Sequence, residues 1–541
     1  MSLANGARGV LDLPLKSQCV VNLPSRMRIC EFILLFGLLN AILYSCCLPL
    51  WEGFDEGFHY AYVETLWQTG DFPILGRSLV PLDVVQSFTL APAGPVVHTW
   101  VPEATTYDNW FRLPVAERER RRSALEKLRP VAGNSMRPNY EAHHAPLAYI
   151  LLAGIDWSMS GWPLPWRVLM LRLFGAAVSV LLVYFGSVKL CRLLSLPGAF
   201  TNALLFTVFC SQMLYAAVAH VANDWLAIGI SVMLLASVVE MMLCPTAGKM
   251  LVEVAWLAAA LLTKAYFLPI LFVVALLPRK WILPACGLLG LAAGPWYARN
   301  LLIYHNLSGM YEAFEGIGIR KTLAAATLVD WPSTAAFLAR GALWTGNASF
   351  TTFSRGTLHV MLAFLFGALI AWSVHWRLIR PPEKLMAAVI AVFSAAIAYA
   401  CCAAFVHMNG NSPGASPWYT QILLLPVLLL AYLGMSRSVV IGRYMAMSIT
   451  VLWTWMLIAT WLVKLFPMYS GATAGPLRLH ELWAWYTLDG AAHAHDFSQL
   501  ALARAPVLYA GMLMSVPGSV VLAFFIVKTL GAGHGGRKDT R

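Results

Sequence analysis

Apolar runs of about 20 residues recur along the chain and are separated by short polar segments. Because a helix needs about 20 residues to cross the hydrocarbon core of a bilayer, each run predicts a transmembrane helix. The predicted spans lie near residues 32–50, 166–190, 201–220, 225–243, 250–263, 266–278, 281–298, 357–376, 385–406, 418–435, 444–466 and 507–529. The pattern therefore predicts an all-α polytopic membrane protein with about twelve transmembrane helices.

The composition agrees with this class. Hydrophobic residues make up 59% of the 541 residues and charged residues only 12%, and the mean hydropathy is +0.67. Soluble domains carry roughly 25% charged residues, so a soluble protein is excluded. The net charge of +12 does not predict a nucleic-acid partner, because the basic residues are scattered over span ends and one loop.

The basic residues also predict how the chain is oriented. Those that flank the spans fall on one side of the membrane if both termini are cytoplasmic: Arg26, Arg28, Lys189, Arg192, Arg279, Lys280, Arg377, Arg380, Lys384, Arg437, Arg443, Arg537 and Lys538. Cytoplasmic loops carry an excess of such residues. The exception, Arg118 to Arg122, lies in a loop too long for this rule to govern. We therefore expect both termini in the cytoplasm.

Three long segments then lie on the external face: 51–165, 299–356 and 467–506. The first contains two stretches, Asp55 to Trp67 and His144 to Trp157, that predict helices lying in the membrane interface. Between them, Arg112 to Arg129 alternates charge signs and predicts an exposed amphipathic helix.

Polar residues gather on this external face. Asp55 and Glu56 follow the first span, at a depth where charge is costly and usually tied to function. The other groups are Tyr140 to Leu147, the set His220, Asn223 and Asp224, the single residue Lys264, and Trp296 to Asn300. A transporter is expected to carry ionisable groups near the bilayer midplane, whereas the spans of this chain are almost free of acids.

These groups resemble motifs of the GT-C superfamily of membrane glycosyltransferases, in the branch of the protein O-mannosyltransferases and the aminoarabinose-to-lipid A transferases. The matching segments are Asp55-Glu56, Asn223-Asp224, Thr263-Lys264, Pro295 to Asn300 and, loosely, His144-Ala145-Pro146-Leu147-Ala148-Tyr149. The resemblance covers about residues 30–435. Two departures concern the donor phosphate: His143-His144 stands where some relatives have a phosphate-binding lysine, and Trp418-Tyr419 replaces an Arg-Tyr pair.

The resemblance implies transfer of a monosaccharide from a polyprenyl-phosphate donor to a lipid, glycan or protein acceptor, with inversion. For a bacterial cell this would place the enzyme in the inner membrane with its site on the periplasmic face. Residues 1–435 would form the catalytic module, and 436–541 would add C-terminal helices whose role the sequence does not indicate.

Such chemistry needs a general base, because a neutral hydroxyl is a poor nucleophile. Asp55 is the candidate base, with Glu56 and Asp224 as further catalytic acids. Fixed cations would stabilise the departing lipid phosphate. The candidate substrate-binding residues are Lys264, Arg299, His143, His144, His59, Tyr297 and Asn223.

Each assignment has a structural alternative. Asp55 and Glu56 could simply begin a helix, where acids favour the positive dipole end, and Asn223-Asp224 could cap one. Lys264 could be a lysine that extends to the interface, Arg299 a span anchor, and His143-His144 surface residues.

Two further histidines leave a metal site open. His59 follows Asp55 by four residues and His220 precedes Asp224 by four, so each could pair with its acid on one helical face or join a divalent-cation site. The metal is left unassigned, and no other cofactor is indicated. Two rival functions also remain: a flippase or exporter of lipid-linked sugars, and a non-catalytic scaffold in polysaccharide assembly.

Overall fold

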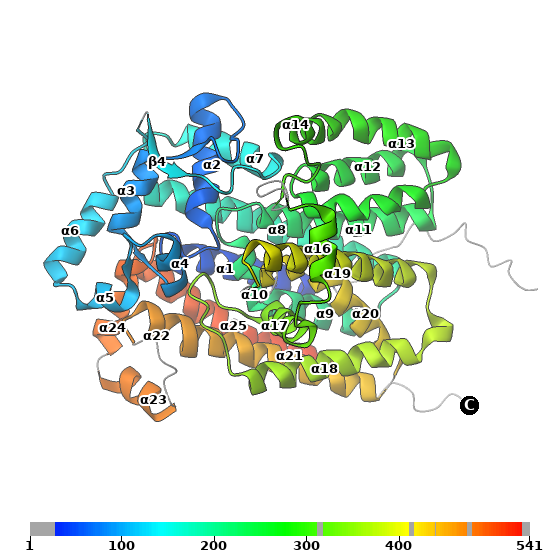
Figure 1. Cartoon of the computed structure of the whole chain (residues 1–541). Coiled ribbons are helices and arrows are strands. Elements are labelled where there is room, and N and C mark those ends of the chain that lie inside the picture. Colours follow the sequence, from blue (N-terminus) through cyan, green and yellow to red (C-terminus); the bar gives the residue numbers. More distant parts are fainter. Residues whose placement is uncertain are drawn as a thin grey trace, which may run out of the picture.

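The structure, a computed structural model, describes residues 27–131, 133–310, 317–410, 416–438, 440–472, 479–488 and 490–532. Helices dominate this part of the chain (Figure 1), and the predicted all-α membrane fold is confirmed.

Eight helical segments are long and apolar enough to cross a membrane. They are α1 (Met27–Cys47), α8 (Leu164–Leu193), α11 (Asp224–Leu243), α18 (Arg355–Val374), α19 (Pro381–His407), η3 with α20 (Pro417–Leu423, Leu424–Arg437), α21 with η4 and α22 (Ile441–Ala459, Thr460–Leu465, Phe466–Tyr469), and α25 (Ala505–Ala532). All eight correspond to predicted spans.

Two further predicted spans are bent pairs of helices. One pair is α9 (Gly198–Cys210) with α10 (Gln212–Val218), bent by 53°, and the other is α13 (Arg279–Ala292) with α14 (Gly294–Tyr304), bent by 56°. If each pair counts as one span, the described residues contain up to ten spans.

The predicted total of twelve is not confirmed. The two remaining predicted spans, 250–263 and 266–278, coincide with α12 (Ala247–Leu261, 15 residues) and η1 (Ala265–Leu276, 12 residues). At a rise of about 1.5 Å per residue, α12 extends roughly 22 Å, less than the hydrocarbon core of about 30 Å. η1 is a 3-10 helix with Pro269 inside it, and proline removes a donor from the helical ladder. Hydropathy alone does not report the short length of α12 or the proline inside η1.

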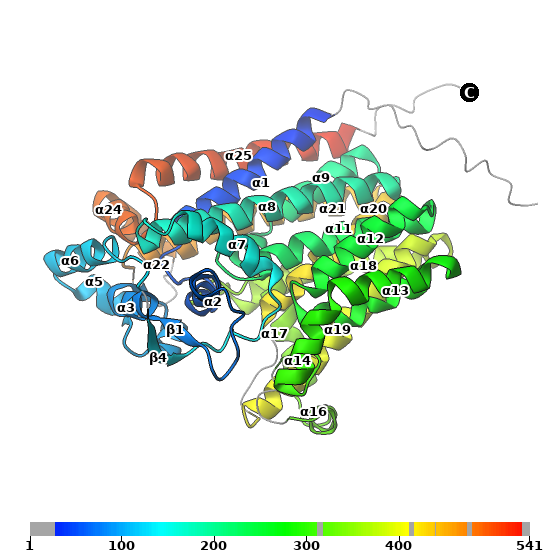
Figure 2. The ribbon, with the colours of Figure 1, turned by 90° about the horizontal axis from the view of Figure 1, so that it is seen from above.

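The C-terminal helices pack on the first span. Figure 2 shows α25 beside α1, and the Ser515 hydroxyl of α25 donates to Asn40 Oδ1 of α1 at 2.8 Å. The start of α1 and the end of α25 lie at the same end of the bundle. The first and last described helices therefore begin and end on one side of the bundle, while the identity of that side stays a prediction.

The first of the segments that were expected on the external face is built around the two predicted interfacial helices, α2 (Glu56–Thr69) and α7 (Leu147–Ser158), which pack on each other. Its smaller elements are α3 (Leu82–Leu90), α4 (Pro95–Trp100), α5 (Tyr107–Arg112) and α6 (Val115–Leu125), with β1 (Leu79–Pro81) antiparallel to β4 (Asn134–Pro138) and β2 (Pro92–Ala93) parallel to β3 (Thr105–Thr106). The other short helices are α16 (Ile319–Ala325), α17 (Trp331–Leu343), η2 (Trp376–Leu378), α23 (Leu479–Leu488) and α24 (Gly490–Leu500).

The three long segments that were expected on the external face are joined by buried polar contacts. Arg118 of α6, which was predicted to be exposed, is buried and pairs with Asp496 of α24 at 2.8 Å. Glu52, directly after α1, accepts from the Tyr107 hydroxyl at 2.6 Å and from the Ser349 backbone N–H at 3.1 Å. These contacts hold the loops together around the residues that follow the first span.

Candidate active site

Asp55 lies in the turn between α1 and α2, in the left-handed backbone region with φ +53°. Few residues other than glycine adopt this conformation, and asparagine and aspartate adopt it most readily. Asp55 occupies the cap position of α2, yet its side chain makes no capping hydrogen bond. Its carboxylate instead accepts from the Tyr140 hydroxyl at 2.7 Å. Capping therefore does not explain this side chain, and a strained position of this kind is a hallmark of functional sites.

Burial raises the pKa of the Asp55 carboxyl above its ordinary value. The negative charge of Glu141 adds to this rise, while the Tyr140 hydrogen bond acts against it. Asp224 and Lys264 also influence this pKa, so both lie within electrostatic reach of Asp55. A carboxylate with a raised pKa is suited to accepting a proton near neutral pH.

Glu56 faces the opposite way. Both of its carboxylate oxygens accept from Arg172 of α8, at 2.7 and 2.5 Å, and one also accepts from the Val221 backbone N–H at 2.9 Å. Burial alone would raise the pKa of Glu56, but the Arg172 guanidinium holds it below its ordinary value. Its contacts are those of a residue that fixes α2 to the membrane bundle.

A second ion pair joins two sequence-predicted residues. Lys264 Nζ contacts Asp224 Oδ1 at 2.5 Å, and both side chains are buried. The ammonium also lies over the rings of Tyr419 and Tyr266, at 4.6 and 5.1 Å from their centroids. Lys264 is therefore not an interfacial lysine that reaches for water, but a buried cation in an aromatic cage.

Two buried side chains near this pair have no hydrogen-bond partner in the described structure. They are His220, at both ring nitrogens, and Asn223, at both amide atoms. Asn223 occupies the cap position of α11 without a capping bond. Buried polar atoms are almost always satisfied, so these atoms are free to hydrogen-bond a bound molecule. The expected pairing of His220 with Asp224 is not among the described hydrogen bonds.

His59, Glu141 and His144 form a compact buried cluster. Glu141 Oε2 lies 2.5 Å from His144 Nε2 and 3.7 Å from His59 Nε2. Burial lowers the pKa of His144 to about 3 and raises that of Glu141. His144 is thus not a surface residue, and His59 faces Glu141 instead of Asp55.

His143 lies beside this cluster. Its Nδ1 is 3.0 Å from the Tyr140 carbonyl, and its ring lies 4.1 Å from that of His144. Glu141 was not assigned a role from the sequence, although the spacing Glu141-x-x-His144 would have indicated it.

Arg299 and Tyr297 contact the framework around the site. Arg299 Nη2 donates to the carbonyls of Phe72 and Pro73 at 3.2 and 2.9 Å, and the Tyr297 hydroxyl donates to the Leu261 carbonyl at 2.9 Å. These bonds position the first external segment and the end of α12. A substrate contact for either residue stays a prediction.

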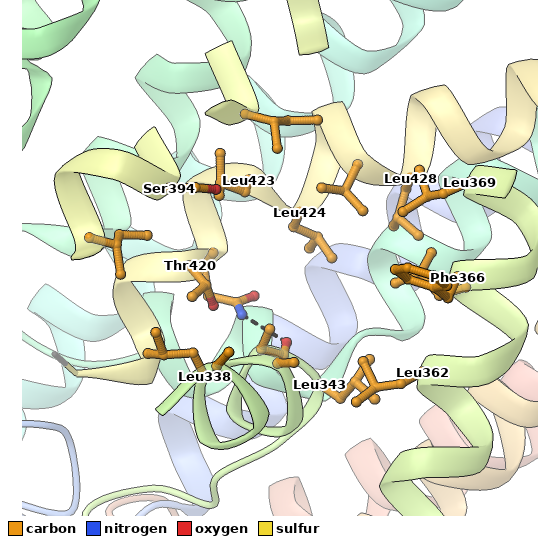
Figure 3. A pocket seen from close by; sticks show the side chains of 18 of the residues that line it. Leu338, Leu343, Leu362, Phe366, Leu369, Ser394, Thr420, Leu423, Leu424 and Leu428 are labelled. Carbon is orange, nitrogen blue, oxygen red and sulfur yellow. Dashed lines mark hydrogen bonds between the residues drawn. The ribbon is translucent and has the colours of Figure 1, made fainter. Parts of the chain in front are cut away.

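An apolar cavity of about 800 Å³ opens between α17, α18, α19 and α20 (Figure 3). Its walls include Leu338, Leu362, Phe366, Leu369 and Leu424, which point toward one another in Figure 3.

The short helix η3 separates this cavity from the polar residues. Thr420 and Gln421 line the cavity, whereas Trp418 stacks on Phe54 with ring centroids 3.9 Å apart and Tyr419 faces Lys264. The polar site and the apolar cavity are therefore neighbours across one short helix.

No protein-family model matches the chain, and no curated protein matches it. Among solved structures, the chain is similar to the crystal structure of ArnT from Cupriavidus metallidurans bound to undecaprenyl phosphate, at 13% identity and a TM-score of 0.46, over 93% of this chain and 78% of that chain.

Proposed function

We propose that this chain is an integral membrane glycosyltransferase. It would move a monosaccharide from a polyprenyl-phosphate donor to a lipid, glycan or protein acceptor on the external face, with inversion. The observation that carries the proposal is Asp55: a carboxylate with a raised pKa in a strained turn, within electrostatic reach of a buried cation. The five motifs that resemble GT-C transferases support the same reaction class.

In this proposal Asp55 is the general base. It takes the proton of the acceptor hydroxyl as the acceptor oxygen bonds to the anomeric carbon. The bond between that carbon and the phosphate oxygen breaks on the opposite face, which inverts the configuration. A positioned general base contributes typically 10²–10⁴-fold in rate, and Tyr140 fixes the direction of the carboxylate.

The departing lipid phosphate needs a cation, and Lys264 is the buried cation of the site. Asp224 keeps the ammonium in place, and the rings of Tyr266 and Tyr419 restrict its movement. His220 and Asn223, with their unpartnered polar atoms, would hydrogen-bond the sugar. Such preorganised groups stabilise charge that develops in the transition state.

The apolar cavity beside η3 is suited to the prenyl chain. Its walls are almost wholly aliphatic and aromatic, and a cavity of 800 Å³ lies within the usual range of ligand pockets, about 300–1,000 Å³. A lipid tail in this cavity would place its phosphate on the side of η3 that carries Tyr419, next to Lys264.

The experiment uses the purified full chain in sealed lipid vesicles, radiolabelled polyprenyl-phosphate sugars and a membrane extract as acceptor. Wild type is compared with Asp55→Asn and with Asp71→Asn, a matched control in the same external segment whose side chain is exposed. We expect transfer by wild type and Asp71→Asn, and a loss of at least about 10²-fold in Asp55→Asn. Equal transfer by all three proteins would remove Asp55 from the mechanism, and labelled lipid moved across the bilayer without transfer would identify a flippase.

A further inference from the structure

We infer that a small pocket beside the end of α1 binds the phosphate of an anionic membrane lipid through Arg122, Arg504 and Trp110. The pocket has a volume of about 180 Å³, and no residue of the candidate active site lines it. Its walls come from the end of α1, from α5 and α6, from the start of α8, and from residues 499–504 between α24 and α25. Figures 1 and 2 show α5, α6 and α24 gathered at one end of the molecule.

The pocket lies where three apolar helices meet. Pro49 and Leu50 directly follow α1, Pro165 and Trp166 belong to the first turn of α8, and Arg504 directly precedes α25. Each of these helices is long and apolar enough to cross a membrane. Because the ends of such helices lie at the depth of the lipid headgroups, the pocket is open to a headgroup.

Two arginines and one indole supply hydrogen-bond donors. Arg122 lies on α6 and Arg504 before α25, and both line the pocket. Trp110 of α5 lines it as well. This side chain is 2% exposed, and its Nε1–H has no hydrogen-bond partner in the described structure. Guanidinium groups bind phosphate through paired, charge-assisted hydrogen bonds, and the indole N–H adds a neutral donor.

Backbone hydrogen bonds hold the walls together without an occupant. The Leu164 N–H donates to the Leu128 carbonyl at 3.1 Å, which connects the chain after α6 to the start of α8. The Leu502 N–H donates to the Cys46 carbonyl at 3.0 Å, which connects the chain before α25 to the end of α1. The site is therefore formed before a ligand enters, which lowers the cost of binding.

The charges that line the pocket leave a single positive charge in excess. Arg122 and Arg504 are opposed only by Glu126, whose Oε1 lies 3.5 Å from Arg122 Nε. Arg122 Nη1 also donates to the carbonyls of Ser498 and Gln499, both at 3.3 Å, and these bonds keep the guanidinium beside the chain before α25. A phosphodiester carries a single negative charge and would balance the excess.

The size of the pocket and its surroundings select a lipid. A volume of 180 Å³ is below the range of about 300–1,000 Å³ that is usual for pockets enclosing a whole ligand, so the pocket takes a headgroup and leaves the acyl chains outside. Trp166, Met170 and Phe174 are each 36–37% exposed. Their four-residue spacing places them on one face of α8, and this apolar face begins at the pocket. Acyl chains can lie along it, whereas a soluble phosphate would make no use of it.

Binding is tested on the full chain, delipidated in a non-ionic detergent, by native mass spectrometry and by the midpoint of thermal unfolding. The probes are phosphatidylglycerol, phosphatidylcholine, whose choline cancels the phosphate charge, and inorganic phosphate. We expect one tightly retained phosphatidylglycerol per chain and a higher midpoint with this lipid than with either other probe. Equal binding of phosphatidylcholine would overturn recognition of the charge, and equal stabilisation by inorganic phosphate would overturn the assignment to a lipid.

Substitutions locate the binding within the molecule. Arg122→Gln and Arg504→Gln should each weaken phosphatidylglycerol binding about 10–100-fold, because each removes charge-assisted hydrogen bonds. Trp110→Phe keeps a ring and removes the N–H, so it should weaken binding about 3–10-fold. The matched control is Arg120→Gln, on the same helix. Its side chain is 74% exposed and does not line the pocket, and this variant should bind the lipid as wild type does.

Variants are compared only where their size-exclusion elution matches that of wild type. Arg504 is exposed, so Arg504→Gln keeps the test available if another variant misfolds. Undiminished affinity for phosphatidylglycerol in Arg504→Gln, or a loss in Arg120→Gln as large as that in Arg122→Gln, would overturn the site. These measurements need no transfer reaction, so their outcome is independent of the proposed function.

Discussion

The two neighbouring acids Asp55 and Glu56 are expected to respond differently to substitution, and Glu56 gives the sharper prediction. Replacing Glu56 by Gln removes the carboxylate that faces the Arg172 guanidinium. Arg172 would keep the carbonyls of Leu48 and Pro49, at 2.7 and 2.8 Å, as acceptors, but its charge would be buried without a counter-ion. We therefore expect a loss of stability for Glu56→Gln.

The size of the loss follows from complete burial of the pair, since both side chains have an exposed fraction of 0%. Removing one partner of a buried ion pair costs about 3–5 kcal/mol, and each 1.4 kcal/mol is tenfold in an equilibrium constant. The folded-to-unfolded ratio should thus fall by roughly a hundred-fold to several thousand-fold. In the double variant with Arg172→Met the uncompensated charge is gone, so it should be more stable than the sum of the single losses predicts, by about 0.5–3 kcal/mol.

The assay is a stepwise unfolding titration of the purified protein in mixed detergent micelles, followed by circular dichroism. Arg192→Met is the matched control, because Arg192 lies on the same helix and is exposed, and it should change the free energy of unfolding by no more than about 0.5 kcal/mol. A loss below about 1 kcal/mol for Glu56→Gln, or strict additivity in the double variant, would refute the reasoning that this pair fixes α2 to the bundle.

Three further outcomes are expected. Burial raises the pKa of Asp55 to about 7, and because the base must be deprotonated, the transfer rate should rise tenfold per pH unit below that value and level off above it. A profile that is flat from pH 5 to 8 would exclude Asp55 as the base. Tyr140→Phe removes the hydrogen bond that favours the charged carboxylate, so the inflection of the profile should move to higher pH by about 1 unit, and an unmoved inflection would show that this bond does not act on Asp55. Ala398→Phe places a large ring in the apolar cavity and should raise KM for the prenyl donor about tenfold, which corresponds to about 1.4 kcal/mol, while Ala395→Phe on the exposed side of α19 should leave KM unchanged.

Much of the fold could be predicted because hydropathy reports the quantity that decides it. A run of about 20 apolar residues is the length that a bilayer selects, and the eight long apolar helices, together with the helices α2 and α7 that were expected in the interface, were predicted at nearly their observed positions in the chain. The breaks that divide a predicted span into two helices were not predicted. Residues 201–220 form one continuous apolar run, but the backbone at Ser211 is extended, with ψ 107°, and divides it into α9 and α10. Composition does not distinguish a straight span from a bent one.

Individual site residues could be predicted from the sequence only where they belong to a recognisable motif. Lys264 and Asp224 were both expected, but their pairing across 40 residues is a property of the packed helices. The expected pairing of His59 with Asp55 assumed that both lie on one helical face. Asp55 has φ +53° and precedes α2, so the four-residue spacing does not bring the two side chains together. His59 instead meets Glu141, a contact between distant parts of the chain that no local pattern indicates.

The left-handed turn at Asp55 also explains why the acid pair could not be divided into roles from its sequence. In a continuous helix, two neighbouring side chains differ in direction by about 100°, and both would lie near the same surface. Here the chain reverses its local twist between them: Asp55 meets Tyr140 of the external segment, and Glu56 enters the bundle to meet Arg172. The buried ion pair fixes the start of α2, and the start of α2 fixes the strained turn that holds the candidate base. Loss of the Glu56 contact should therefore reduce activity as well as stability, through the position of Asp55, and the sequence motif identifies a structural unit in which the two acids contact different parts of the protein.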